Sequence, residues 1–318
     1  MTYPDFSILV ATKDRPENVR RLLSSVAQST TKPKALVVIS SGRPIHDVIS
    51  EFRDDLNIDY FHSEVTGQVN QKKIGISKLQ NEIPWVIFLD DDLLLAHNSL
   101  EKAFETLSQY KTTGESIVGI GLGLTPTSRL KRSSYIHNLV GRALRLSSGV
   151  PGKVIPSGQG VSYLENPEPI YTEWLNGASM WKIESAIEYV SLVPSSRYAA
   201  CEDLVFSYRQ SKNGKLLFAP GAKVFFQESE PNDYNRSQAI ISGTAWRYFF
   251  VKSNPELSQW QLMYSQVGRL TYILATQPWN TEAIQAGIWS VKHLFISIVR
   301  NKEPMFLINK IIQEEFFL

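Results

Sequence analysis

The chain has 318 residues, of which 43% are hydrophobic and 20% are charged, and its formal net charge is +2. This composition is typical of a globular protein, and so small a charge does not favour nucleic acid as a partner. Cys201 is the only cysteine, which excludes a disulfide framework and a multi-thiolate metal site. We find no signal-peptide pattern and no run of ~20 apolar residues, so we expect a cytoplasmic protein without a membrane-spanning helix.

Residues 1–90 alternate between short apolar runs and segments in which apolar residues recur at helical spacing. The runs predict strands at 6–11, 35–40, 57–62 and 85–89, and the spacing predicts helices at 17–29 and 68–80. This alternation is typical of a mostly parallel sheet with helices on both faces. We therefore predict an α/β fold of the Rossmann-like type, with a further strand at 117–124.

Polar residues follow three of the predicted strands, at Thr12 to Arg15, Ser40 to Gly42 and Asp90 to Asp92. In open parallel sheets, ligands bind at the edge where the carboxyl ends of the strands meet. We therefore expect these three segments to lie along one rim, outside the core. Adjacent carboxylates repel one another, so a positive partner is expected beside the aspartates.

The three aspartates Asp90, Asp91 and Asp92 predict a site for a divalent cation. Mg²⁺ and Mn²⁺ prefer oxygen ligands, and Mg²⁺ is usually shared between one or two carboxylates and substrate phosphates. The alternative is an acidic turn or helix start. That alternative needs a single aspartate and leaves the other two unexplained, so we favour the metal and phosphate interpretation.

The second half of the chain is less regular. Residues 125–170 are rich in Gly, Ser and Pro and carry several arginines and lysines, which predicts a long basic loop. A helix is predicted from about Lys182, another begins at Asp203, and the sequence from about Arg236 is mostly helical and rich in aromatic residues. Such C-terminal helices either pack against their own domain or lie on an anionic membrane surface.

Four stretches together resemble a known family: ILVATKDRPENVRRLLSSV, FLDDDLLL, EWLNGASMW and CEDLVFSYRQSKNGKLLFAP. They lie between Ile8 and Pro220, and they resemble the family 2 glycosyltransferases with the GT-A fold. The resemblance implies an inverting enzyme of polysaccharide biosynthesis. Such an enzyme moves a sugar from a nucleotide-diphospho-sugar donor to a glycan or lipid-linked acceptor, with Mg²⁺ or Mn²⁺ as cofactor.

The resemblance also implies roles for particular residues. FLDDD resembles the Asp-X-Asp element, in which Asp90 would face the donor ribose, Asp91 would be the middle residue of the donor site and Asp92 would hold the metal. CED resembles the Glu-Asp element, in which Asp203 would be the catalytic base. Glu202 is the second candidate for that role. The other predicted site residues are Thr12, Asp14, Arg15 and Ser40 for the donor, and Trp174, Asn176 and Gly177 for the acceptor.

The sequence departs from the family pattern at two places. Many relatives carry an acid after the second strand that binds the nucleobase, and this chain has Ser40-Ser41-Gly42 there. Many also carry a metal-binding histidine near the end of the last core strand, where this chain has Gln227 and Glu228. The donor nucleobase is therefore left open. Either Gln227 or Glu228 substitutes for the histidine, or Asp92 and phosphates hold the metal alone.

We predict a GT-A domain over residues 1–230, with a nucleotide-binding half at about 1–124 and an acceptor half at about 170–230. A helical extension over 231–318 follows, and it is the expected site of peripheral contact with the cytoplasmic face of a membrane. Two alternatives stay open. One is a GT-A domain that binds nucleotide or glycan with weak or no catalysis, and the other is a nucleotidyltransferase, for which Lys13 and Arg15 supply basic residues.

Overall fold

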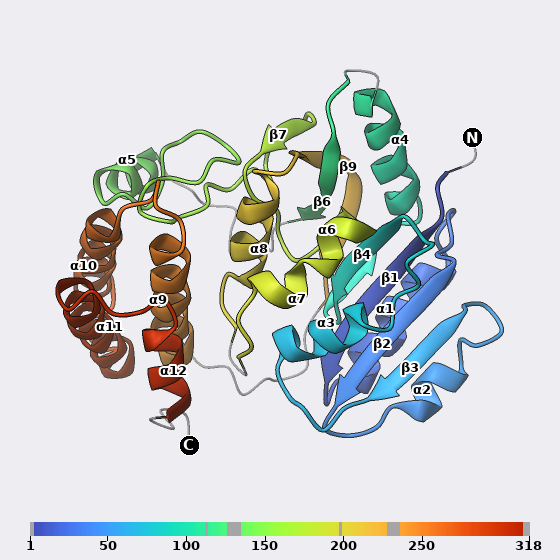
Figure 1. Ribbon diagram of the computed structural model, residues 1–318, viewed down its shortest axis with the longest axis horizontal. Coiled ribbons are helices and arrows are strands. Elements are labelled where there is room, and N and C mark those ends of the chain that lie inside the picture. Colours follow the sequence, from blue (N-terminus) through green and yellow to red (C-terminus); the bar gives the residue numbers. More distant parts are fainter. Residues whose placement is uncertain (1–2, 112–113, 126–134, 197–198, 228–235, 314–318) are drawn as a thin grey trace. The chain divides into compact units, whose positions relative to one another are not determined.

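A computed structural model describes residues 3–111, 114–125, 135–196, 199–227 and 236–313. The chain forms two compact units, each built from three segments. Unit 1 comprises Met1–Lys131, Ser162–Ser195 and Asp203–Pro231, and unit 2 comprises Arg132–Val161, Ser196–Glu202 and Asn232–Leu318. Figure 1 labels the elements of both units, which are described one at a time below.

Within the described residues, a nine-stranded sheet forms the centre of unit 1, in the order β3-β2-β1-β4-β8-β6-β9-β5, with β7 paired to β9. Parallel pairing joins β3, β2, β1 and β4 and also joins β6 to β9, whereas β5, β7 and β8 run antiparallel to their partners. The mostly parallel α/β sheet predicted from the sequence is confirmed. The strands are β1 Phe6–Lys13, β2 Ala35–Ser41, β3 Ile58–His62, β4 Trp85–Asp90, β5 Leu93–Leu95, β6 Ile117–Thr125, β7 Ile170–Thr172, β8 Ser179–Lys182 and β9 Lys215–Phe226.

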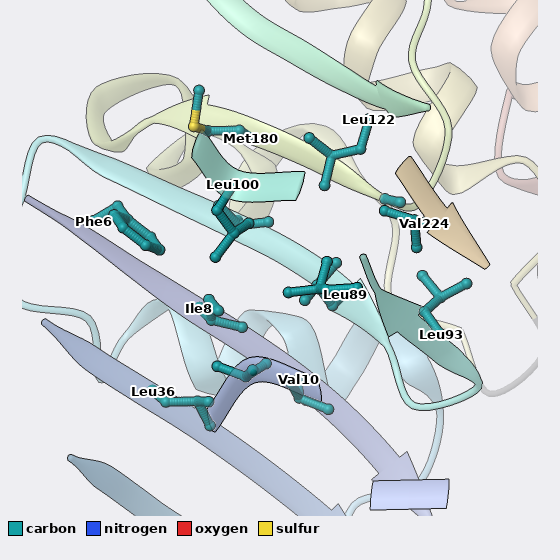
Figure 2. Close-up of a cluster of buried hydrophobic side chains, with 14 of the residues drawn as sticks. Phe6, Ile8, Val10, Leu36, Leu89, Leu93, Leu100, Leu122, Met180 and Val224 are labelled. Carbon is teal, nitrogen blue, oxygen red and sulfur yellow. The ribbon is translucent and has the colours of Figure 1, made fainter. Parts of the chain in front are cut away.

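Helices cover both faces of this sheet. The side chains of Phe6, Ile8 and Val10 point to the face that packs against α1, α2 and α4, and Figure 2 shows this core continuing across β4, β6, β8 and β9. On the opposite face, α3 lies so close to β1 that a Cβ on Gly75 would stand 2.2 Å from Leu9 Cδ1. The helices with residues in unit 1 are α1 Pro16–Ala27, α2 His46–Ser50, α3 Gln68–Ile76, α4 Ser99–Lys111, α6 Ile183–Ile187, α7 Tyr189–Leu192 and α8 Glu202–Gln210.

Unit 2 is helical. Its helices are α5 Tyr135–Ala143, α9 Arg236–Lys252, α10 Gln259–Thr276, α11 Thr281–Val299 and α12 Phe306–Gln313. Side chains cap the N-termini of α10 and α11: Ser258 Oγ accepts from Gln261 N at 3.3 Å, and Asn280 Oδ1 accepts from Ala283 N at 3.0 Å. Tyr248 of α9 donates its hydroxyl to Lys302 O, which ties α9 to the segment before α12. None of the helices in the described part of the chain is long and apolar enough to cross a membrane.

The predicted basic loop over 125–170 is wrong in part. Residues 126–134 lie outside the described residues, but the rest contains α5 and a bridge between Val154 and Gly160. Just after α5, the side chain of Leu144 packs against Gly268 of α10, where an added Cβ would stand 2.8 Å from Leu144 Cδ2. Packing between distant segments therefore outweighs the Gly- and Ser-rich composition on which the loop prediction relied. The helix predicted from Lys182 is also split, into the short α6 and α7.

Candidate active site

The carboxyl ends of β1, β2, β3 and β4 form one rim of the unit 1 sheet. The parallel register pairs Thr12 with Ser40, Ser40 with His62, and Ala11 with Asp90. The expectation that the segments after β1, β2 and β4 share one edge is confirmed by this register. The rim is therefore the place where a ligand of the sheet would bind.

Asp91 is not at the open mouth of this rim. Its carboxylate accepts a hydrogen bond from Thr12 Oγ1 at 2.6 Å and forms an ion pair with Arg15 NH1 at 2.9 Å, and the residue is only 5% exposed. Burial raises the pKa of Asp91 to about 6, against the opposing effects of Thr12 and Arg15. Arg15 is thus the positively charged partner that was expected beside the aspartates. The expectation that all three aspartates lie outside the core is wrong for Asp91.

Asp90 lies between the rim and the segment predicted to bind the acceptor. Its Oδ1 accepts a hydrogen bond from Gln68 Nε2 and lies 3.4 Å from the Nζ of Lys72, a residue that is only 3% exposed. Its Oδ2 would be 2.7 Å from a Cβ placed on Gly177. Any side chain at position 177 would therefore clash with the Asp90 carboxylate, so this close approach requires glycine. The sequence signal for Lys72 is a lysine inside a helix that is predicted to lie on the sheet.

Asp92 and Gln227 are neighbours at the end of β9. Gln227 N donates to Asp92 O at 2.9 Å, and Gln227 Nε2 donates to Asp91 O at 2.7 Å and to Asn18 O at 3.2 Å. These bonds fix the orientation of the amide, whose Oε1 is buried without a hydrogen-bond partner among the described residues. Glu228, the other candidate, lies outside the described residues. In the described part of the chain, no three His, Cys, Asp or Glu residues are grouped as a metal cluster.

The other two predicted donor residues differ in accessibility. Asp14 has a φ of +56° and a side chain that is 51% exposed, and its Oδ1 accepts from Arg43 N at 2.7 Å. Ser40 is enclosed, because it is 1% exposed and its Oγ lies 2.7 Å from Tyr60 Oη and 3.0 Å from His62 Nδ1. Asp14 is therefore open to a ligand, whereas Ser40 supports the rim from within.

Tyr163 organises the predicted acceptor segment. Its hydroxyl accepts a hydrogen bond from Asn176 N at 2.8 Å, and its ring meets Trp174 edge-on with centroids 5.1 Å apart. Burial raises the pKa of Tyr163, and the charge of Asp203 raises it further, so Asp203 lies near the same segment. Asn176 Oδ1 accepts from Ala178 N at 3.1 Å, which holds the turn. No sequence pattern pointed to Tyr163.

Asp203 stands at the start of α8. Its Oδ1 accepts from Leu204 N at 2.7 Å, and its backbone oxygen accepts from the hydroxyl of Ser207. Ser207 in turn accepts a hydrogen bond from Leu175 N at 3.0 Å, so the first turn of α8 is tied to the acceptor segment. The neighbouring Glu202 is 8% exposed, and Asp203 is the more accessible of the two carboxylates.

The strand order and the mostly parallel pairing of the sheet belong to a GT-A fold. Residues 7–156, a little under half of the chain, match the model of the family described as Glycosyl transferase family 2. Over these residues the chain is similar to that family. A curated protein of Rickettsia bellii (strain RML369-C), described as an uncharacterized glycosyltransferase, is 29% identical over 97 residues, which are 30% of this chain and 14% of that protein.

Solved structures give the same fold at low sequence identity. S. aureus TarS, residues 1–349, superposes with a TM-score of 0.54 at 13% identity, covering 90% of this chain and 81% of that one. The mannosyltransferase PcManGT from Pyrobaculum calidifontis, solved with GDP-Man and Mn²⁺, gives 0.55 at 14% identity, with 95% and 89% covered. TarS has also been solved with UDP-GlcNAc.

Proposed function

We propose that this chain is an inverting glycosyltransferase that moves a sugar from a nucleotide-diphospho-sugar to a glycan or lipid-linked acceptor. The observation that carries the proposal is the position of Asp90, whose carboxylate belongs to the rim and also touches Gly177 of the acceptor segment. A donor at the rim would thus lie against the segment that receives the acceptor. The complexes of the structural neighbours with UDP-GlcNAc and GDP-Man support this class of donor.

The donor diphosphate would be held with Mg²⁺ or Mn²⁺ at Asp92 and Gln227. The fit rests on Gln227 Oε1, a buried amide oxygen that has no hydrogen-bond partner among the described residues and is the kind of hard ligand these ions prefer. A bound divalent ion offsets the negative charge of the departing diphosphate. Asp92 and Gln227 then position the diphosphate, while Asp90, with Gln68 and Lys72 on its Oδ1, faces the ribose.

Inversion needs a carboxylate that takes the proton of the acceptor hydroxyl as it attacks. We assign this role to Asp203, with Glu202 as the less accessible fallback. The hydrogen bond from Leu204 N occupies one oxygen of Asp203 and fixes the carboxylate. Trp174, Asn176 and Gly177 would hold the acceptor. In this assignment the GT-A domain covers 1–230, divided into nucleotide and acceptor halves at about 1–124 and 170–230.

The first test is turnover. The purified chain is incubated with UDP-, dTDP- and GDP-sugars and Mn²⁺ or Mg²⁺, and release of nucleoside diphosphate is measured. We expect one nucleotide to be released, in a metal-dependent reaction. Release of pyrophosphate from a nucleoside triphosphate would instead favour the nucleotidyltransferase alternative. Tight binding of a nucleotide or glycan without any release would favour the weak or inactive GT-A alternative.

We also propose that the helical extension over 231–318 contacts the cytoplasmic face of a membrane. Apolar side chains at helical spacing are exposed along α10, and Trp279 beyond it is 77% exposed. The exposed residues of α10 are Trp260, Tyr264, Val267, Tyr272 and Leu274, and those of α11 are Ile288, Phe295 and Val299. Stripes of this kind, with Trp and Tyr, are suited to a membrane interface.

Membrane contact is tested by sedimentation with anionic phosphatidylglycerol vesicles. We expect the wild type to sediment with the vesicles and the double variant Trp260→Ser, Trp279→Ser to bind several-fold more weakly, because two large interfacial side chains are removed. Val190→Ser is the matched control, since Val190 is an exposed apolar residue of α7 in unit 1. Equal sedimentation of all three proteins would contradict the proposal.

A further inference from the structure

Two arginines from different helices of unit 2 converge on one side chain. Arg247 of α9 donates from Nε to Gln159 Oε1 at 2.9 Å, and Arg269 of α10 donates from NH2 to the same oxygen at 3.4 Å. Arg247 NH1 also donates to Gly243 O at 3.1 Å. These bonds use few of the five N–H groups that each guanidinium carries. Toward the residues that the structure describes, the two groups therefore leave most of their donors available for another partner.

Neither charge has an acidic counterion in the part of the chain that the structure describes. Among the described residues, no carboxylate lies within 4.0 Å of either guanidinium. Burial lowers the pKa of Arg269 to about 10, and the charge of Arg247 lowers it further in the same direction. Arg269 nevertheless stays protonated at neutral pH. Two like charges held together in a half-buried place are unfavourable unless an anion joins them.

The loop that carries Gln159 contacts α9 and the residue before α10. Gly158 has a φ of +76°, and a Cβ on it would stand 2.4 Å from Val251 Cγ2, one helical turn beyond Arg247 on α9. Ser258 N, just before α10, donates to Pro156 O at 2.7 Å. Gln159 is 6% exposed, and its Nε2 is buried with no hydrogen-bond partner among the described residues. The loop thus presents a third donor beside the two guanidiniums.

The chemistry of these three donors selects a phosphate group. The planar guanidinium fork matches the oxygens of a phosphate, and charge-assisted bonds of this type are about twice as strong as neutral ones. Two arginines match the double charge of a phosphate monoester or a diphosphate. A single carboxylate would offset only one of them. The amide N–H of Gln159, which has no partner in the described segments, supplies a further bond to a phosphate oxygen.

We propose that Arg247, Arg269 and Gln159 form a site in unit 2 that binds a phosphate group. This site does not depend on the proposed glycosyltransferase function. The phosphate belongs either to a soluble phosphorylated sugar or to a lipid phosphate. Both present the same doubly charged group to the site.

The site is tested by calorimetric titration of pyrophosphate into the full chain, with EDTA and without nucleotide. We expect binding by the wild type and by Asp92→Ala, and affinity lower by roughly tenfold or more in Arg247→Gln and Arg269→Gln, since each loses a charge-assisted fork. Arg300→Gln, an exposed arginine at the end of α11, is the matched control and should bind as the wild type does. Absence of wild-type binding, or equal affinity in all variants, would overturn the site.

Gln159→Glu gives a second variant that is expected to fold. It places a carboxylate between the two guanidiniums, so it should raise the melting temperature and abolish pyrophosphate binding. Unchanged binding in this variant would also refute the site. Glucose 1-phosphate and vesicles that contain polyprenyl phosphate then distinguish the two sources, and binding of neither would contradict a sugar phosphate or a lipid phosphate as the ligand. None of these binding experiments requires turnover. Failure of the transferase proposal is therefore distinguished by a different result, the absence of nucleotide release from any sugar donor.

Discussion

Replacement of Asp203 by asparagine is expected to abolish sugar transfer and to leave nucleotide binding unchanged. Asparagine cannot take up the acceptor proton, and a positioned general base contributes about 10²–10⁴-fold to a rate. The substitution preserves local structure, because the Oδ1 of asparagine still accepts the hydrogen bond that Leu204 N donates at 2.7 Å in the native chain. We therefore expect kcat to fall by at least about 10²-fold, with little change in the affinity for the nucleotide.

Steady-state rates of nucleotide release with each donor and acceptor check this prediction. Glu202→Gln separates the two carboxylates of the Glu-Asp element, and Asp54→Asn controls for the loss of a negative charge at an exposed site. Wild-type turnover in Asp203→Asn would rule out Asp203 as the base. If Glu202→Gln alone caused the loss, the role would pass to Glu202, despite its 8% exposure.

The rim of the sheet was predictable from sequence because it depends on local patterns. Continuous apolar runs such as Phe6 to Ala11 mark strands buried on both faces, and the polar residues that follow them must lie at the carboxyl ends. The register that pairs Thr12 with Ser40 and Ala11 with Asp90 follows once the strands are parallel neighbours. Local chemistry was enough to bring these segments together.

The partners within the rim were not predictable. Asp91 meets Thr12 and Arg15, which lie 79 and 76 residues away in sequence, and nothing in either segment distinguishes this pairing from contact with a nucleotide. Tyr163 lies in a stretch whose composition indicates a loop, so its role beside Asn176 depends on long-range packing. The sequence indicated the helices and strands, but it did not indicate which side chains of distant segments contact one another.

The arginine pair of unit 2 shows the same limit. Arg247 and Arg269 lie in two helices that the sequence indicated only as a helical, aromatic-rich region. Their convergence depends on Gly158, whose positive φ allows the loop to approach Val251. A glycine in a Gly-rich segment gives no sign of this contact. The absence of a nearby carboxylate among the described residues can be judged only in three dimensions.

Replacement of Asp92 by alanine is expected to abolish the metal-dependent part of nucleotide binding. Loss of a supporting partner outside the coordination shell already lowers metal affinity by about 10–100-fold, and loss of a ligand carboxylate should cost at least as much. The backbone bond from Gln227 N to Asp92 O does not involve the side chain, so β9 should keep its position. Calorimetric titration of UDP, dTDP and GDP with and without Mn²⁺ measures the effect.

The controls decide whether Asp92 acts through the metal. EDTA should reduce the nucleotide affinity of the wild type to that of Asp92→Ala and should not change the variant, because both treatments remove the same ion. Asp55→Ala, at an exposed position of unit 1, should bind as the wild type does. Gln227→Leu removes the buried amide oxygen and should weaken only the binding measured with Mn²⁺, provided that thermal melting shows a folded chain. Metal-dependent binding of full strength in Asp92→Ala would place the ion elsewhere on the rim.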